Sequence, residues 1–224
     1  MTGSNAHTRW WADGAVGVIV LDNPPMNVLS DDNRRGIREA LAEFRGAGTR
    51  AVVLTGAGDR AFCGGADLKE EEELTTETVG KFLQRGDETF RALREYERPI
   101  VAAVNGWAMG GGLVLALWCD VRVGSTRAKL GAVGVKVGLM ASNVQLSRLL
   151  FEGRARDLLL TGRTVEADEA YRLGLLSSVV APERLMDEAM AWARDIAIRP
   201  PDLVAALKQT LNTALDPIAA PAPR

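Results

Sequence analysis

The sequence is poor in the side chains on which many hydrolytic and metal-dependent mechanisms rely. Its 224 residues include one histidine and two cysteines. His7 lies in a polar leader before the first predicted strand, whereas a Ser/His/Asp or Cys/His mechanism needs a histidine inside the fold. Cys63 and Cys119 do not make a disulfide framework or a metal-ligand spacing, and they indicate a reducing compartment. We therefore expect neither a catalytic triad nor a metal site.

An excess of charge and long apolar runs are also missing. The formal net charge is only -2, which argues against general binding to nucleic acid or to a membrane surface, because both need a basic face. No apolar run approaches the roughly 20 residues that cross a bilayer. The first ten residues lack the basic and apolar regions of a secretory signal. The sequence predicts a soluble cytoplasmic protein without nucleic-acid or membrane partners.

Hydrophobic residues make up 47% of the chain, enough to bury a substantial core. Strand and helix patterns alternate from residue 15 to about residue 180, which indicates an α/β fold with mainly parallel connections. No repeat or linker divides the chain. We expect a single domain over residues 1–224, with a core over about 10–180 and a helical C-terminal part over about 182–215.

The patterns also predict individual elements. Predicted strands cover residues 15–21, 50–55, 98–110 and 119–125, and residues 9–12 are expected to pair with the first of them. Predicted helices cover residues 30–47, 81–97, 141–161 (as one or two helices), 166–172 and 182–198, in addition to an apolar helix after the glycines near residue 111. Ser30 is the expected N-cap of the first helix. Residues 68–80 are acidic and aperiodic, and residues 216–224 are expected to fray.

Two glycine-containing loops follow predicted strands: "TGAGDRAFCGGAD" at residues 55–67 and "NGWAMGGGL" at residues 105–113. Glycine permits positive φ and a close backbone approach, and the first N–H groups of a following helix lack intrahelical partners. Two such loops face to face make a site for a developing oxyanion. The loops lack the spacing of a P-loop or a dinucleotide fingerprint. The alternative, that the glycines only allow tight turns, stays open at this point.

The stretches "VVLTGAGDRAFCGGADLKE" (52–70) and "RPIVAAVNGWAMGGGLVLALWCDVRV" (98–123) resemble the enoyl-CoA hydratase/isomerase (crotonase) family. Supporting segments are "VIVLDNPPMNVLS", "VKVGLMASNVQLSRLL" and "GRARDLLLTGRTVEADEAYRLGLLSSVV". The likeness runs in family order from about residue 10 to residue 210. It implies a crotonase-type α/β spiral of ββα units with C-terminal helices, shortened at the C-terminus, in a homotrimer or a dimer of trimers.

The resemblance also implies a site. Family members bind an acyl-CoA thioester and stabilise its enolate or tetrahedral oxyanion with two backbone N–H groups, which fall here on Ala66 and Gly111. Coenzyme A belongs to the substrate, and no prosthetic group is implied. By the same resemblance, coenzyme A contacts fall on six residues: Pro25, Met26, Val28, Gly64, Leu68 and Lys69. For Lys69, near phosphate, the alternative is a solvated lysine beside an acidic run.

The chain departs from the family at both usual acid–base positions. Hydratases of the family use two glutamates, and isomerases keep the second. The first position is Val114 in "GGGLVLAL", and the second is Gly134 in "GAVGVKVG". Losing a catalytic carboxylate removes about 100- to 10,000-fold of assistance for each role. A standard two-glutamate hydratase mechanism is therefore not expected.

Other polar residues offer only partial replacements. Ser142 and Asn143 fall where other branches of the family carry alternative catalytic groups, but neither is a strong base, and Ser142 is equally an N-cap candidate. One of the glutamates of residues 70–73 is a candidate acid or base, although a solvated charge run is the favoured interpretation. Cys63 has no activating histidine or nearby cation, so packing is its expected role. Asp120 is expected to be structural.

These observations leave two main hypotheses. The first is an enzyme that stabilises an acyl-CoA enolate with little side-chain help, for instance in decarboxylation of a malonyl-type thioester, or a specialised hydratase or isomerase. The second is an inactive protein that binds acyl-CoA, or a partner of an active paralogue. The sequence does not decide between them, nor does it give the acyl group.

Overall fold

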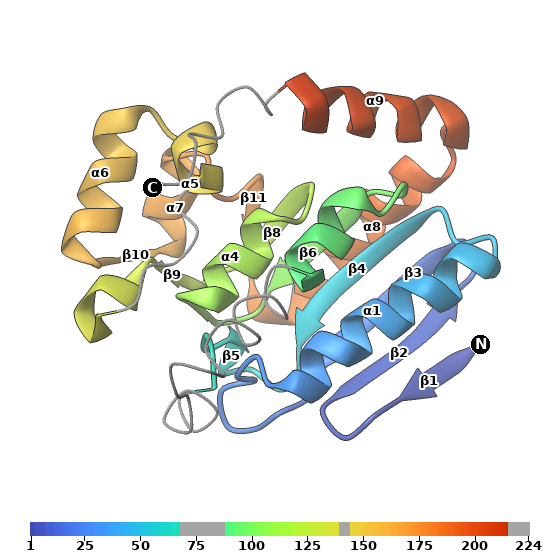
Figure 1. The fold of residues 1–224 in the computed structure, drawn as a ribbon, viewed down its shortest axis with the longest axis horizontal. Helices are drawn as coiled ribbons and strands as arrows, with labels where there is room; N and C mark the ends of the chain where they lie inside the picture. Colours follow the sequence, from blue (N-terminus) through green and yellow to red (C-terminus); the bar gives the residue numbers. More distant parts are fainter. Residues whose placement is uncertain (68–87, 139–143, 215–224) are drawn as a thin grey trace, which may run out of the picture.

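The computed structural model describes residues 1–67, 88–138 and 144–214 of the chain. These residues form two β-sheets with helices on both faces of the larger one (Figure 1). The larger sheet has seven strands in the order β1-β2-β3-β4-β6-β8-β11, and the smaller has four in the order β10-β9-β7-β5. The candidate glycine loops lie where the chain passes from the larger sheet into the smaller one.

The larger sheet consists of β1 (Thr2–Ser4), β2 (Thr8–Asp13), β3 (Val16–Leu21), β4 (Ala51–Gly56), β6 (Ile100–Val104), β8 (Val121–Ser125) and β11 (Ser178–Val180). The run from β3 through β4, β6 and β8 to β11 is parallel, while β1 and β2 add an antiparallel edge. The strands β3, β4 and β6 are buried along their whole length. Continuous burial explains their unbroken valine-rich and alanine-rich sequences, because helices cover both faces of the sheet.

The smaller sheet consists of β5 (Ala61–Cys63), β7 (Trp107–Met109), β9 (Lys129–Gly131) and β10 (Thr164–Glu166). The named helices are α1 (Asp31–Gly46), α4 (Gly111–Leu117), α5 (Val144–Leu149), α6 (Glu152–Thr161), α7 (Ala167–Arg172), α8 (Leu185–Ala197) and α9 (Pro201–Ala214), with 3-10 helices η1 (Val133–Val137) and η2 (Pro182–Arg184). Residues 88–95 are also helical.

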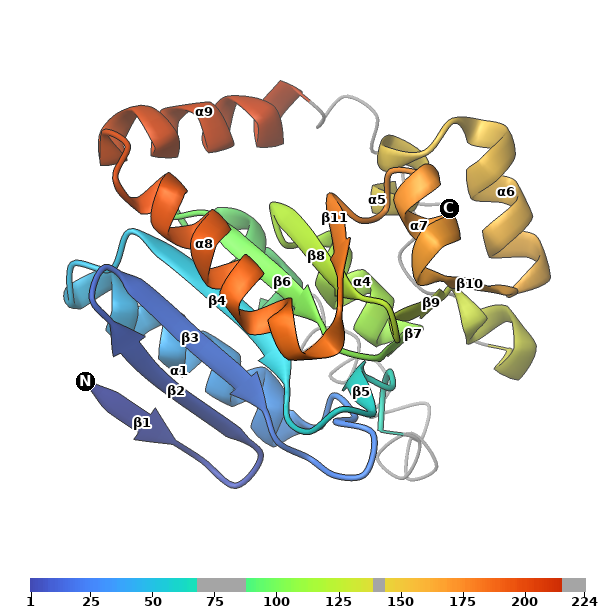
Figure 2. The same ribbon diagram turned by 180° about the vertical axis from the view of Figure 1, so that it is seen from behind.

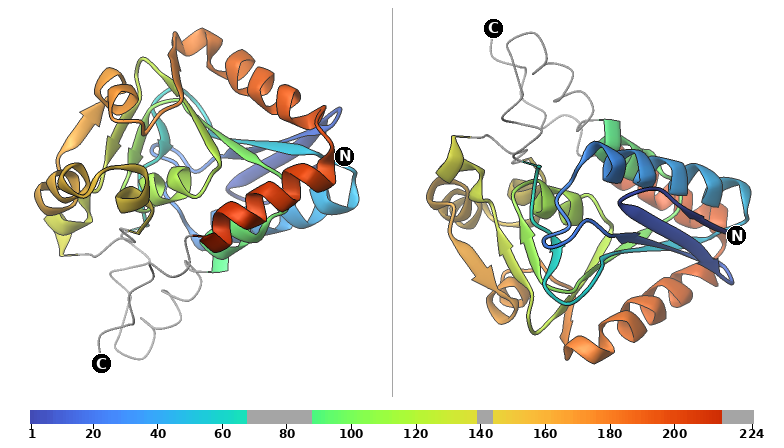
Figure 3. Two further views of the ribbon diagram at one scale, coloured as in Figure 1. Left: turned by 90° about the horizontal axis from the view of Figure 1, so that it is seen from above. Right: turned by 90° about the horizontal axis from the view of Figure 1, so that it is seen from below.

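Two separate apolar clusters surround the larger sheet. The first joins α1, α4 and residues 93–96 to one face, with Ile37, Phe44 and Leu115 fully buried. The second joins α8 to the other face through Leu185, Ala189 and Ala193 among others. Figures 2 and 3 show α1 and α8 on opposite sides of the strands. The sheet is thereby packed on both faces, so the loops at the ends of β4 and β6 are attached to a rigid layer.

Most predicted elements are confirmed where the structure describes them, and one is wrong in its extent. The predictions for residues 68–80 and 216–224 lie outside the described residues. The predicted strand over residues 98–110 is two strands, β6 and β7, which belong to different sheets. The break falls at Asn105 and Gly106, where a Cβ on Gly106 would lie 2.2 Å from the carbonyl oxygen of Arg60. This contact between two backbones requires glycine and turns the chain out of the larger sheet.

The expectation that His7 lies in a leader outside the fold is wrong. The strand β1 precedes His7, and its ring Nδ1 lies 2.8 Å from the hydroxyl oxygen of Ser30, the N-cap of α1. Asp32 approaches the same ring nitrogen at 4.0 Å. Because serine and aspartate share one nitrogen, this is not the relay of a triad, in which the two partners take opposite nitrogens. His7 instead supports the cap that the sequence predicted.

The helix α9 is attached to the body by a buried lysine. The side chain of Lys208 is 7% exposed, and its Nζ lies 2.8 Å from Oδ2 of Asp120 and 3.1 Å from the carbonyl oxygen of Arg98. The same carboxylate oxygen accepts the N–H of Ile100 at 2.7 Å, at the start of β6. These contacts agree with the structural role expected for Asp120.

We expect Lys208→Met to lower the free energy of unfolding by about 2 kcal/mol, less than for a fully buried pair because the Asp120 side chain is 29% exposed. Arg199→Met is the control, since Arg199 pairs with Asp195 on the surface of the molecule. Thermal unfolding of both variants measures the difference. Equal, small shifts for the two variants would show that the Lys208 pair does not anchor α9.

Candidate active site

The two glycine loops lie against each other, as the sequence predicted. A Cβ on Gly111 would lie 3.5 Å from the amide nitrogen of Ala66. A Cβ on Gly65 would lie 2.9 Å from the carbonyl oxygen of Met109 and 3.7 Å from the amide nitrogen of Gly111. The segment that follows β5 therefore runs alongside the segment that opens α4.

The amides of Ala66 and Gly111 have no hydrogen-bond acceptor among the described residues. The neighbouring hydrogen bonds use other groups: Leu29 N–H donates to Gly65 O at 2.7 Å, and Val114 N–H donates to Gly110 O at 3.1 Å. Within the described part of the chain, neither the Ala66 nor the Gly111 N–H donates a hydrogen bond. Both residues are partly exposed. Two adjacent N–H groups without acceptors are the arrangement that stabilises an oxyanion.

Glycine is required at three positions around this pair. Gly65 has a φ of 111° and Gly110 a φ of 50°, which is the region that favours glycine. A Cβ on Gly112 would lie 2.0 Å from the carbonyl oxygen of Cys63. The start of α4 therefore packs directly on the backbone of β5, and this contact sets how close Gly111 comes to Ala66.

Three of the six residues implied in coenzyme A contacts, Met26, Val28 and Gly64, come together. Gly64 N–H donates to Met26 O at 2.7 Å, and a Cβ on Gly64 would meet the Met26 and Val28 side chains at 3.0 and 3.6 Å. Pro25, in the same loop, is exposed. The other two, Leu68 and Lys69, lie outside the described residues, so their role stays a prediction.

No carboxylate occupies the two positions of the family's glutamates. Val114 is 3% exposed on α4, a helix with neither an acidic residue in its first turn nor a basic one in its last. Gly134 is buried in η1. Ser142, Asn143 and the glutamates of residues 70–73 lie outside the described residues.

Burial raises the pKa of the Cys63 thiol to about 11 and that of Cys119 to about 12. Only about one Cys63 thiol in a thousand is then ionised at pH 8, and the thiolate is the reactive form. We expect no reaction with a disulfide reagent in the folded protein, and reaction of both thiols after denaturation. Rapid labelling of Cys63 in the folded protein would contradict the packing role.

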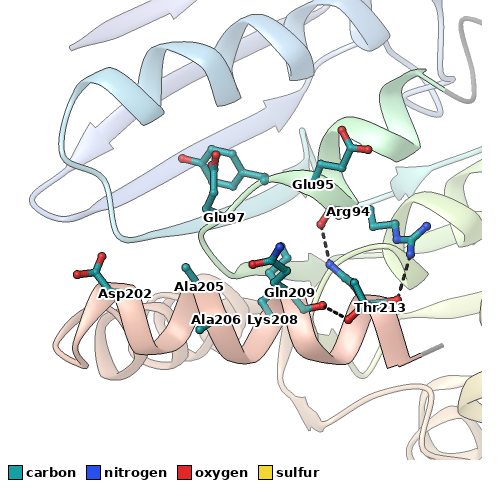
Figure 4. A pocket seen from close by; sticks show the side chains of 11 residues that line it. Arg94, Glu95, Glu97, Asp202, Ala205, Ala206, Lys208, Gln209 and Thr213 are labelled. Carbon is teal, nitrogen blue, oxygen red and sulfur yellow. Dashed lines mark hydrogen bonds between the residues drawn. The ribbon is translucent and has the colours of Figure 1, made fainter. Parts of the chain in front are cut away.

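The structure also has a cavity of about 590 Å³ away from the glycine loops. It lies between α9 and residues 94–97, at the start of β6 rather than at its end (Figure 4). Lys208 on its wall is paired with Asp120, and Glu97 is paired with Arg45 at 3.1 Å. The sequence did not predict this cavity.

In the described ranges, no three histidine, cysteine, aspartate or glutamate side chains are grouped as metal ligands would be. None of the helices described is both long and apolar enough to span a bilayer.

Two buried asparagines close to the glycine loops are not predicted by the sequence patterns. The amides of Asn27 and Asn105 both donate to the carbonyl oxygen of Ala61, at 2.7 and 3.2 Å. The dipeptide Asn105–Gly106 is a turn signal that the strand pattern concealed. Nothing in the sequence indicated that Asn27 reaches the same carbonyl.

Comparison with known proteins identifies the family and the fold of the chain. The family model described as enoyl-CoA hydratase/isomerase matches residues 12–222. A short-chain-enoyl-CoA hydratase from Clostridium acetobutylicum is 36% identical over 208 residues, which cover 91% of this chain and 80% of that protein. An (E)-benzylidenesuccinyl-CoA hydratase from Thauera aromatica is 39% identical over 199 residues, covering 87% and 77% of the two chains.

A solved structure, that of an enoyl-CoA hydratase subunit I from Geobacillus kaustophilus, superimposes with a TM-score of 0.88 at 36% identity and covers 96% of this chain and 84% of that one. The predicted crotonase-type α/β fold is thus confirmed. With a family model spanning nearly the whole chain and relatives well above 30% identity, this protein belongs to the enoyl-CoA hydratase/isomerase (crotonase) family.

Proposed function

We propose that the protein binds an acyl-CoA thioester and stabilises an enolate or tetrahedral oxyanion with the N–H groups of Ala66 and Gly111. The observation that carries this proposal is the pair of adjacent amides that have no acceptor in the described part of the chain. Fixed backbone donors aimed at a developing negative charge stabilise the transition state without having to reorganise. The relatives named above are hydratases of CoA thioesters, which supports an enzyme of this general type.

The reaction that fits this site needs little acid–base help from side chains. In decarboxylation of a malonyl-type thioester, the bond between the α-carbon and the carboxylate breaks and its electron pair becomes the enolate. Carbon dioxide leaves, and a proton from water then completes the α-carbon. The two amides stabilise the enolate oxygen, and no enzyme carboxylate is required. Hydration is different, because it needs a base for water and an acid for the α-carbon.

The alternative function is binding of acyl-CoA without turnover. The apolar side chain of Val114 on α4, at the position of a family glutamate, favours this candidate because it supplies no proton. A partner of an active paralogue would share the same features.

Purified protein offered crotonyl-CoA and methylmalonyl-CoA, beside a direct acyl-CoA binding titration, separates these functions. We expect binding of both thioesters, loss of carbon dioxide from methylmalonyl-CoA and little hydration of crotonyl-CoA. Binding without turnover of any thioester establishes the alternative function. Absence of binding refutes both.

The resemblance further implies a homotrimer or a dimer of trimers. In support, α9 carries Leu203, Leu207 and Leu211 at a spacing of four residues, and these side chains are 57, 56 and 66% exposed. Exposed leucines in such a row are typical of a surface that is covered in an assembly. Light scattering on the purified protein tests this, and a monomer would contradict it.

A further inference from the structure

Two buried side-chain amides meet at one carbonyl, that of Ala61 at the start of β5. Nδ2 of Asn27 donates to Ala61 O at 2.7 Å and to Ala57 O at 3.0 Å. Nδ2 of Asn105 donates to Ala61 O at 3.2 Å, Gly58 O at 2.9 Å and Gly56 O at 3.1 Å. Asn27 is 2% exposed and Asn105 is 9% exposed. We call the two asparagines and the Ala61 carbonyl the asparagine node.

The asparagine node joins the three segments that form the candidate site. Asn27 belongs to a loop that is bonded to the segment after β5. Gly64 N–H donates to Met26 O, and Leu29 N–H donates to Gly65 O, each at 2.7 Å. Asn105 follows β6 and opens the connection through β7 to Gly111. Ala61 begins β5, which leads to Ala66. One carbonyl is therefore tied to the loop of residues 22–30 and to both glycine loops.

The chemistry of the node requires asparagine rather than another polar residue. The carboxamide supplies N–H donors, whereas a carboxylate at this place would face carbonyl oxygens with its own oxygens. Asn27 has a φ of 51°, which asparagine tolerates better than most residues. The Oδ1 atom of Asn105 is buried without a hydrogen-bond partner among the described residues. Leaving a buried acceptor unsatisfied costs about 1–3 kcal/mol of stability. The Nδ2 atom of Asn105 therefore makes its hydrogen bonds in spite of a cost at Oδ1.

We infer that Asn27 and Asn105 are positioning residues, whose shared bonds to the Ala61 carbonyl fix the separation between the Ala66 and Gly111 N–H groups. This inference rests on the proposed function. Neither side chain is assigned a contact with substrate. They act through the backbone, by holding the start of β5 and the turn after β6 to one point.

The variants Asn27→Gly and Asn105→Ala test the inference. Glycine at position 27 keeps the positive φ and removes only the amide. If the two oxyanion donors separate, kcat for the preferred thioester should fall about 100-fold, as misplacement by about 1 Å does in other enzymes. For Asn105→Ala, the Kd for acyl-CoA should stay within about threefold of the wild-type value, which is a change in binding free energy of less than about 1 kcal/mol. Because the amides share one carbonyl, the double variant should lose less than the sum of the two single effects.

Asn212→Ala is the matched control. Nδ2 of Asn212 donates to Arg94 O at 2.8 Å, between α9 and residues 88–95 and outside both glycine loops, so the variant also loses a side-chain amide donor to a backbone carbonyl. We expect it to lower the free energy of unfolding by about 1 kcal/mol and to leave kcat unchanged. If all three variants lose stability alike and none loses kcat, the asparagine node is purely structural and the inference is wrong.

Hydrogen exchange of the free protein provides a readout that does not depend on activity. Loss of either asparagine should speed amide exchange over both residues 61–66 and residues 105–111, and should leave β3 unchanged. Faster exchange confined to the mutated loop would overturn the inference. A wild-type protein that neither binds nor converts acyl-CoA would refute the proposed function instead, while the exchange pattern would still decide whether the node couples the two loops.

Discussion

Alanine at position 112 is expected to lower turnover of the preferred acyl-CoA about 100-fold or more. The added Cβ would lie 2.0 Å from the carbonyl oxygen of Cys63, so α4 must move away from β5. That movement carries Gly111 away from Ala66 and separates the two oxyanion donors. Overpacking of this kind costs about 1–3 kcal/mol. Steady-state kinetics and thermal unfolding of Gly112→Ala measure both consequences.

Gly153→Ala is the matched control for this variant. Gly153 lies in α6, and a Cβ there would have no other atom within 4 Å. Alanine inside a helix is favoured over glycine by about 1 kcal/mol, so the control should be slightly more stable and fully active. Full activity of Gly112→Ala would contradict the role given to the contact between α4 and β5.

Restoring both family glutamates is expected to create hydration activity. In Val114→Glu/Gly134→Glu, one carboxylate would stand on α4, three residues after Gly111, and the other in η1. Acid and base assistance each contribute about 100- to 10,000-fold, and hydration needs both. We therefore expect at least about a 100-fold rise in crotonyl-CoA hydration for the double variant, and a much smaller rise for either single variant. Loss of the enoyl-thioester absorbance follows the reaction.

The glutamine pair Val114→Gln/Gly134→Gln is the appropriate control, because it has nearly the same shape and no ionisable group. Val114 is 3% exposed, so burial should raise the pKa of a glutamate placed there and lower stability. Stability is therefore measured alongside activity. Rapid crotonyl-CoA hydration by the wild-type protein, no faster in the glutamate pair, would show that other groups of the protein already replace the missing carboxylates.

Local sequence signals were sufficient for the elements that depend on neighbours in the chain. The Ser30 cap fixed the start of α1, and the Ser30 side chain accepts the Asn33 N–H as a capping residue does. The glycine loops were recognised from their place after apolar strands, and the structure brings them together. The identity of Val114 alone shows that α4 lacks the glutamate that the family resemblance places there.

Features that depend on contacts far apart in the sequence were not predictable in this way. The apolar run from β6 into β7 reads as one strand in spite of the turn signal Asn105–Gly106, and the approach of Gly106 to the Arg60 carbonyl marks where the two strands separate. His7 was placed outside the fold because nothing nearby indicates its contact with Ser30, 23 residues away. Asn27 and Asn105 lie 34 and 44 positions along the chain from Ala61, which the asparagine node joins them to. The periodicity of the sequence carries no information over such separations.

The vibrational frequency of a bound thioester carbonyl tests the central claim most directly. Butyryl-CoA labelled with 13C at its carbonyl carbon, bound to the wild-type protein, gives an isotope-edited infrared band for that one group. Hydrogen bonds from Ala66 and Gly111 polarise the carbonyl, so the band should shift to lower frequency than in water, and Gly112→Ala should reverse most of the shift. A bound thioester whose carbonyl band stays at its solution frequency would contradict the claim that these two amides form an oxyanion site.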